Sequence, residues 1–337
     1  MKRIITLFLT LALILSLCSC AAPGEKADDG RLQIVATLFP YYDFARAIAG
    51  GRADVTLLLS PGREAHSFEP TPLDAVTISE ANVFLYNGGE GEYWVEEMLD
   101  AAGEHIAVKA RMMDYVDALG EEFSEGMQGA DEHDHDHDHD DHDHDDYDHD
   151  HEEDEHDSDE IEYDEHIWTS PKNAAILCRA VCEAICKADP ANEDFYRANC
   201  DDYCAQIEAL DARFSALCES APRKLLVFAD RFPMLYFCRE YGLDYRAAFH
   251  GCSGDTEPSL ATIKFLIDKV EDENIPVVYT IDFGTKKVAA VVSECTGAAI
   301  ETIYSMQTVS RADFDAGETY LTLMERNFEA LRKGLNE

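Results

Sequence analysis

The sequence predicts an α/β protein of two Rossmann-like lobes, each with a parallel sheet flanked by helices, joined by one long rigid helix. Three observations support this fold class. Short runs of β-branched and aromatic residues alternate with helical patterns in both halves of the chain, as they do where helices connect parallel strands. The 337 residues exceed what one compact core usually absorbs. A long helical stretch separates the two halves.

Each half carries the elements of one lobe. In the first half we expect strands at 32–37, 55–59, 82–86 and 106–109, and helices at 42–49, 73–80 and 93–102. In the second half we expect strands at 224–228, 245–249, 277–281 and 299–304, and helices at 233–241, 260–272 and 286–295. The predicted domains are therefore a first lobe at 32–170 and a second lobe at 222–337.

A helical segment at 171–221 connects these lobes and is interrupted only at Asp189-Pro190. Its second piece, 191–220, is thirty residues long, and at 1.5 Å rise per residue it spans roughly 45 Å. A single rigid helix of this length limits how far two lobes can hinge.

The N-terminus resembles the signal of an exported lipoprotein. Lys2 and Arg3 precede an apolar run at 4–17, which is shorter than the ~20 residues that a membrane-spanning helix needs. The following Leu17-Cys18-Ser19-Cys20 resembles a bacterial lipobox. We expect residues 1–19 to be a lipoprotein signal peptide, Cys20 to receive the lipid and residues 20–31 to be a flexible tether. An ordinary signal peptide with incidental cysteines is the alternative.

Acidic residues dominate the composition. The chain has 69 Asp and Glu against 27 Lys and Arg, a formal net charge of −42. A nucleic-acid partner is therefore not expected, because binding to phosphate needs clustered basic residues.

Nine of the thirteen histidines lie in one acidic segment, 131–156, that has no apolar periodicity. Such a segment cannot bury enough surface to fold, so we expect a disordered loop over about 121–163. Imidazoles bind zinc, copper and nickel, and the alternating carboxylates attract cations. The segment is interpreted as an auxiliary metal-collecting loop through the following residues: His133, His135, His137, His139, His142, His144, His149, His151 and His156. A merely solubilising acidic tract is the alternative.

Three further histidines follow strands or precede a helix, where open α/β sheets place their ligands. His66 follows the Pro61-Gly62 turn, His166 precedes the helix that Ser170-Pro171 would begin, and His250 closes a predicted strand. A lone histidine is usually only a hydrogen-bonded or surface side chain. Three at such positions indicate metal ligands.

The strings PGREAHSFEPTP and DEHIWTSP, the acidic histidine loop, the long middle helix and the lipobox together resemble the zinc and manganese solute-binding lipoproteins of bacterial ABC importers. The resemblance covers nearly the whole mature chain. It implies one metal ion in the cleft between two lobes, with His66 and His166 as the first two ligands. It also implies that His250, seven residues before Glu257-Pro258, is the third ligand.

The sequence departs from this family pattern at two places. Where many members carry a histidine, in the segment 228–232, this chain has Ala229. Where relatives with four protein ligands supply a carboxylate, it has Tyr304-Ser305-Met306. The fourth position is left to water, to a loop histidine or to a carboxylate from the following candidates: Glu64, Asp230 and Asp282.

The resemblance implies a protein that captures Zn²⁺ outside the cytoplasm, anchored by lipid to the bacterial cell membrane. It further implies delivery to a membrane permease powered by a separate ATPase, since this chain has no Walker A string. A monomer is expected. The alternatives are a manganese or other divalent-metal carrier, a metal-buffering surface lipoprotein, and a zinc-dependent hydrolase. The chain has no HExxH helix or GxSxG elbow, so we do not expect an enzyme.

Nine cysteines follow Cys20, and their odd number leaves at least one unpaired thiol. Cys178, Cys182 and Cys186 are four residues apart on one predicted helix, and Cys200 and Cys204 repeat the spacing. This pattern indicates either a thiolate metal site or small buried residues where helices pack. A bridge between Cys252 and Cys295 is a further possibility that the sequence does not decide.

Overall fold

This computed structural model describes residues 30–63, 68–102, 106–128, 162–253 and 257–336. The predicted signal peptide, Cys20, most of the tether, Glu64, His66 and all nine loop histidines lie outside the described residues. From Leu32 onward the chain forms one compact unit.

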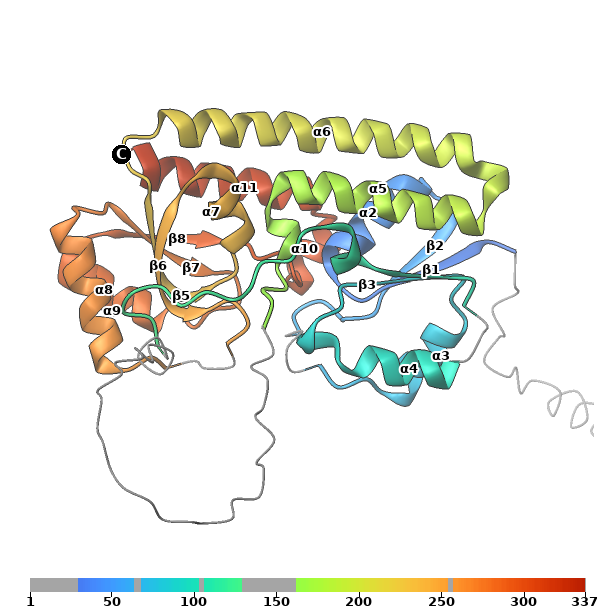
Figure 1. Ribbon diagram of the computed structural model, residues 1–337, viewed down its shortest axis with the longest axis horizontal. Helices are drawn as coiled ribbons and strands as arrows, with labels where there is room; N and C mark the ends of the chain where they lie inside the picture. Colours follow the sequence, from blue (N-terminus) through green and yellow to red (C-terminus); the bar gives the residue numbers. More distant parts are fainter. Residues whose placement is uncertain (1–29, 64–67, 103–105, 129–161, 254–256, 337) are drawn as a thin grey trace, which may run out of the picture. The chain divides into compact units, whose positions relative to one another are not determined.

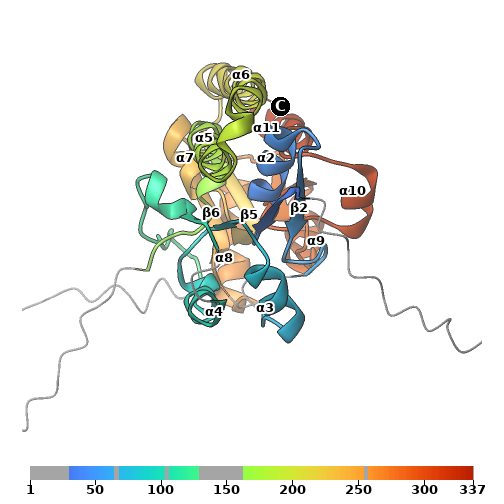
Figure 2. The same cartoon turned by 90° about the vertical axis from the view of Figure 1, so that its right-hand side faces the viewer.

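The first lobe contains a four-stranded parallel sheet in the order β2-β1-β3-β4. Its strands are β1 (Leu32–Ala36), β2 (Ala53–Leu57), β3 (Val83–Tyr86) and β4 (Val108–Arg111). The connecting helices are α2 (Phe39–Ala49), α3 (Pro72–Ser79) and α4 (Trp94–Ala102). Both views show α2 on one side of this sheet and the pair α3 and α4 on the other (Figures 1 and 2).

The second lobe repeats this arrangement, with a parallel sheet in the order β6-β5-β7-β8. Its strands are β5 (Leu225–Phe232), β6 (Asp244–His250), β7 (Val277–Ile281) and β8 (Ala299–Ile303). The helices are α7 (Leu235–Tyr241), α8 (Leu260–Asp272), α9 (Lys287–Thr296), α10 (Arg311–Ala316) and α11 (Tyr320–Asn336). Helices α8 and α9 pack against each other and against the sheet, which α11 also contacts.

Two helices connect the lobes, α5 (Pro171–Ala188) and α6 (Glu193–Ser220). Helix α5 begins where the sequence indicates, because the Ser170 side chain accepts a hydrogen bond from the backbone N–H of Asn173 and proline occupies the first turn. Helix α6 has 28 residues and is about 42 Å long. It extends along both lobes, and α11 packs against it (Figure 1). The two-lobe fold class is confirmed.

The lobes are joined by more than this helix. The indole N–H of Trp168 donates to the carbonyl of Ser305 at 2.8 Å, and the Tyr320 hydroxyl donates to the carbonyl of Trp168 at 2.9 Å. The backbone N–H of Gly62 donates to the carbonyl of Val309 at 2.8 Å. One continuous hydrophobic core includes buried residues from both sheets. These contacts restrain the lobes from separating.

Most described elements begin and end within three residues of the expected ones, and two differences are larger. Strand β5 extends to Phe232, so Asp230 lies within the strand, at an irregularity between Phe228 and Arg231, and not after it. The C-terminal helices α10 and α11 were not expected, although the apolar positions Leu323, Leu331 and Leu335 are buried on one face of α11. No helix in the described ranges is both long enough and apolar enough to cross a membrane.

The expected disordered loop at 121–163 is wrong at both ends, since 121–128 are described and Tyr163 forms an antiparallel bridge with Gly120. Residues 121–128 are placed against the second lobe, where the N–H of Gln128 donates to the carbonyl of Ala248 at 3.0 Å. Met127 is buried, and Gly126, at a φ of 76°, packs so closely on Phe265 that a side chain would collide with the ring. These contacts anchor 121–128 to the second lobe.

Candidate functional site

His166 is held in one orientation by Asp164. An oxygen of Asp164 accepts the backbone N–H of His166 at 2.7 Å and lies 3.1 Å from the ring Nδ1. The ring is 2% exposed and packs edge-on against Trp168. Burial lowers the pKa of His166, but the carboxylates of Asp164, Glu121 and Glu165 outweigh it, so the pKa is raised. If Nδ1 donates to Asp164, the Nε2 atom presents the lone pair that a metal requires.

His250 is the last residue of β6 and has a carboxylate partner of its own. Its Nδ1 lies 3.6 Å from Oε1 of Glu121, which is a charge contact longer than a hydrogen bond. The interaction with Glu121 is the main cause of the raised pKa of His250, and partial burial opposes it. The ring also packs against Phe123, with centroids 5.2 Å apart.

Glu121 is a site residue that the sequence did not indicate. Its side chain is 6% exposed, and Oε1 also accepts the backbone N–H of Cys252 at 3.3 Å. Burial raises its pKa, but the interactions with His250, Cys252 and His166 together lower it. Glu121 therefore contributes a buried negative charge between the two histidines. The available signal was the position of Phe123 and Met127 just after Glu121, because they mark a segment that can be buried.

A small cavity of about 20 Å³ adjoins His166, with Arg231, Pro233, Gly251 and Ser305 among its lining residues. A space of this size accommodates a single water or ion. Gly251 is required there, because a Cβ atom would lie 3.1 Å from the His166 ring and 2.9 Å from the carbonyl of Phe232.

The charge of Arg231 opposes a cation in this cavity, so the nearby carboxylates must offset it. Three carboxylates act electrostatically on His166 in this way: Asp164, Glu121 and Glu165. The neighbourhood of His166 is therefore net acidic.

The two described candidates for a fourth ligand are differently placed. Both carboxylate oxygens of Asp230 accept backbone N–H groups, from Arg231 at 2.9 Å and from Ile281 at 3.3 Å. Asp230 thus joins β5 to β7. Asp282 accepts the N–H of Ser305, a residue that lines the cavity, at 3.2 Å. Neither carboxylate lines the cavity itself, but both accept N–H groups from residues that do: Arg231 and Ile281 for Asp230, and Ser305 for Asp282.

The structure brings His166, His250 and Glu121 into one neighbourhood, whereas His66 and Glu64 lie outside the described residues. In the parts of the chain that are described, only three cysteines on α5 and α6 have ligand atoms all within 4.8 Å of one another. Carboxylates thus lie beside the rings of His166 and His250 and orient them. The ligand atoms of these residues are not all within 4.8 Å of one another. The Cys252 and Cys295 thiols are both free, so the possible bridge between them is not formed.

Comparisons with known proteins identify the family of this chain. Residues 34–334 match the family model of ZnuA, described as zinc-uptake complex component A, periplasmic. The chain is 30% identical over 333 residues to the high-affinity zinc uptake system protein ZnuA of Bacillus subtilis, covering 98% of this chain and 97% of that protein. It is 28% identical to the zinc-binding lipoprotein AdcA of Streptococcus pneumoniae, of whose length it spans 61%.

Solved structures share the fold. The metal-dependent lipoprotein YcdH of Bacillus subtilis superimposes with a TM-score of 0.71 at 26% identity, covering 90% of this chain and 100% of that one. The Zn(II)-bound ZnuA-like domain of Streptococcus pneumoniae AdcA gives a TM-score of 0.70 at 24% identity, covering 91% and 100%. The match along almost the whole described chain shows that this protein belongs to the ZnuA family of metal-binding transport components, which are not enzymes.

Proposed function

We propose that this protein captures Zn²⁺ outside the cytoplasm and delivers it to the membrane permease of an ABC importer driven by a separate ATPase. The observation that supports this most directly is the pairing of each described candidate ligand with a buried carboxylate. Asp164 lies beside His166, and Glu121 lies beside His250. Metal-binding histidines commonly have such a partner on the other ring nitrogen, which fixes the tautomer and makes the ligand more basic.

The proposed ligands are His66, His166 and His250, one from the segment after β2, one before α5 and one at the end of β6. Imidazole suits zinc in tetrahedral sites, whereas manganese prefers oxygen donors. The fourth position is open to water, to a histidine of the acidic loop, or to one of the carboxylates Glu64, Asp230 and Asp282. Asp230 is the weakest of the original candidates because its two oxygens already accept backbone N–H groups.

The other parts of the chain serve capture and anchoring in this proposal. Residues 1–19 are the signal peptide, Cys20 carries the lipid, and 20–31 tether a monomer made of the lobes 32–170 and 222–337 and the helical segment 171–221. The acidic histidine segment at 131–156 collects metal. Cys20→Ala should release the protein into the medium or leave the precursor uncleaved, while Cys18→Ala should not. Unchanged lipid labelling of Cys20→Ala would contradict the anchor.

The central experiment titrates the metal-free protein with Zn²⁺ and Mn²⁺ in competition with a chelator of known affinity. We expect one tight zinc site that His66→Ala, His166→Ala and His250→Ala each weaken severely, because two remaining protein ligands hold a tetrahedral ion poorly. His144→Ala, in the acidic loop, is the matched control and should leave the tight site unchanged. Tighter manganese than zinc would contradict the metal assignment, and an unaffected His250→Ala would remove His250 from the ligands.

A further inference from the structure

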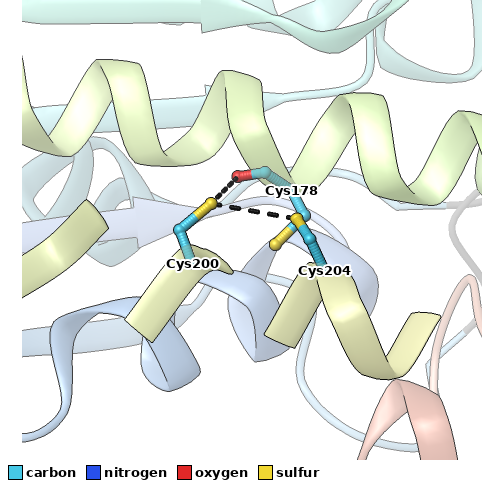
Figure 3. A group of neighbouring side chains, drawn as sticks. All are labelled: Cys178, Cys200 and Cys204. Carbon is cyan, nitrogen blue, oxygen red and sulfur yellow. Dashed lines mark hydrogen bonds between the residues drawn. The ribbon is translucent and has the colours of Figure 1, made fainter. Parts of the chain in front are cut away.

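A second group of potential metal ligands lies between α5 and α6. Cys178 on α5 and Cys200 and Cys204 on α6 point toward one another (Figure 3), with all three sulfur atoms within 4.8 Å. The Sγ atoms of Cys200 and Cys204 are 3.9 Å apart. Four thiolates around Zn²⁺ at 2.3 Å stand about 3.8 Å apart, so only small movements separate this arrangement from coordination.

The cluster is enclosed and contains only sulfur donors. The three cysteines are at most 3% exposed, and no histidine or carboxylate completes the group of close ligand atoms among the described residues. Thiolate donors of this kind select soft ions such as Cu(I), in contrast to the imidazoles and carboxylates of the histidine site. The two neighbourhoods therefore differ in metal preference.

The protonated thiols have acceptors when no metal is bound. Cys200 donates to the carbonyl of Cys178 at 3.9 Å, and Cys204 donates to the carbonyl of Ala175 at 3.7 Å. The guanidinium of Arg179 lies near Cys200 and Cys204 and would offset part of the charge of their thiolates. Cys182, one turn along α5, also interacts with Cys200 but lies outside this group of three.

We propose that Cys178, Cys200 and Cys204 form a buried thiolate site for one thiophilic d¹⁰ cation of the Cu(I) or Cd(II) kind. On binding, the three S–H bonds break heterolytically, three metal–sulfur bonds form and three protons go to solvent, with no change of oxidation state. The site is distinct from the proposed zinc site and does not depend on it. A bound ion would connect α5 to α6 and stabilise the folded state by mass action.

Cd(II) is a suitable probe, because its thiolate complexes absorb in the ultraviolet and its imidazole and carboxylate complexes do not produce that band. The full mature chain is reduced, loaded with zinc at its histidine site and titrated anaerobically with Cd(II). We expect a thiolate band that saturates at one Cd(II) per chain. The double variant Cys200→Ala/Cys204→Ala should lose it.

Cys218→Ala/Cys238→Ala is the matched control, since both cysteines are as deeply buried but belong to no group of three ligands among the residues that the structure describes. It should retain the band in full. Absence of the band in the unmodified protein, or an equal band in the two double variants, would show that the cysteines serve only in packing.

A further measurement covers the case in which the Cys200→Ala/Cys204→Ala variant does not fold. Alkylation of the unmodified protein under partial denaturation, followed by mass spectrometry, should show Cys178, Cys200 and Cys204 protected by Cd(II) and Cys218 unaffected. Equal labelling of Cys200 and Cys218 with and without Cd(II) would overturn the proposal.

Discussion

The ring Nδ1 of His250 lies 3.6 Å from Oε1 of Glu121, and the Nδ1 of His166 lies 3.1 Å from Oδ1 of Asp164. In both candidate ligands a carboxylate thus lies beside the ring Nδ1. Glu121 precedes the acidic segment 131–156 in the sequence, whereas Asp164 follows it. The antiparallel bridge between Gly120 and Tyr163 holds the two flanking segments together, and the N–H of Glu121 donates to the carbonyl of Glu162 at 2.8 Å. Residues 119–121 and 162–164 are thereby joined to each other beside His166 and His250.

Glu121→Gln should weaken zinc binding about 10–100-fold, which is the usual cost of losing a partner that orients a metal ligand. The amide keeps the shape of the side chain but removes the negative charge beside His250. Competition with a chromogenic chelator measures the change. Glu122→Gln is the control, because that neighbour pairs with Arg239 at the surface. Equal affinities for the two variants would show that Glu121 has no role in the site.

The regular elements were largely predictable from the sequence. Strand β7 at Val277–Ile281 and helix α8 at Leu260–Asp272 begin and end where the pattern indicates. Local signals suffice there, since a β-branched run and a helix capped by Ser259 need no distant partner. Strand β5 runs four residues further than expected because Arg231 and Phe232 pair with Phe249 and His250 of β6 beyond an irregularity, and such pairing is a long-range contact.

The candidate site was only partly predictable. His166 and His250 could be found because they stand at the ends of elements, but Glu121 is one of many acidic residues before the histidine run. The apolar residues that follow Glu121 indicate burial, but its place beside His250 depends on the pairing of 119–121 with 162–164, which is a long-range contact. Arg231 was missed for a similar reason, because the position of its side chain beside the cavity depends on the irregularity in β5.

Deleting residues 131–156 should leave one tight zinc ion per chain and remove several weaker ones. The deletion retains 121–128 and 162–163, so the contacts of Glu121 and Gln128 with the second lobe persist. Isothermal titration with zinc separates the two classes of site. Loss of the tight site would mean that the loop supplies a primary ligand.

The loop histidines should also release metal as they protonate below pH ~6.5, before carboxylates lose theirs. Repeating the titration of the full chain at pH 7.5 and pH 5.5 tests this order. Weak binding that persists unchanged at the lower pH would assign it to the carboxylates.

Glu92→Gln should flatten the pH dependence of stability. Burial raises the pKa of Glu92 from its ordinary 4.5 to about 7, although its Oε2 accepts the N–H of Gly88 at 2.9 Å. The folded state therefore binds this proton more tightly than the unfolded state, and stability falls as the pH rises from about 4.5 to about 7. The difference in unfolding free energy between the two proteins should change by up to about 3 kcal/mol across that window.

Urea unfolding of metal-free protein at several pH values measures this effect. Glu90→Gln is the control, because the Glu90 residue is exposed two positions away and should not alter the profile. A slope that is the same for Glu92→Gln and the unmodified protein would show that Glu92 is ionised at a normal pH in the folded state.

Asp43→Asn should destabilise the junction of α2, α6 and α11. The Asp43 side chain is 1% exposed, and its oxygens accept hydrogen bonds from the Tyr203 hydroxyl at 2.5 Å, the Tyr320 N–H at 2.9 Å and the Arg46 guanidinium at 3.0 Å. The amide loses the charge and turns one acceptor into a donor that faces other donors. We expect a loss of about 2–4 kcal/mol in the free energy of unfolding, since breaking a buried charged network leaves its partners unsatisfied.

Asp114→Asn provides a matched comparison for this substitution. Asp114 also pairs with an arginine three residues away, Arg111 at 3.2 Å, but its side chain is 61% exposed. Solvent screens such a pair, so the expected loss is less than about 1 kcal/mol. Urea unfolding of both variants in the absence of metal gives the two values. Similar losses of unfolding free energy in the two variants would mean that the contacts of Asp43 with Tyr203 and Tyr320 add nothing beyond a surface ion pair. Apolar packing would then be what holds the lobes together at this junction.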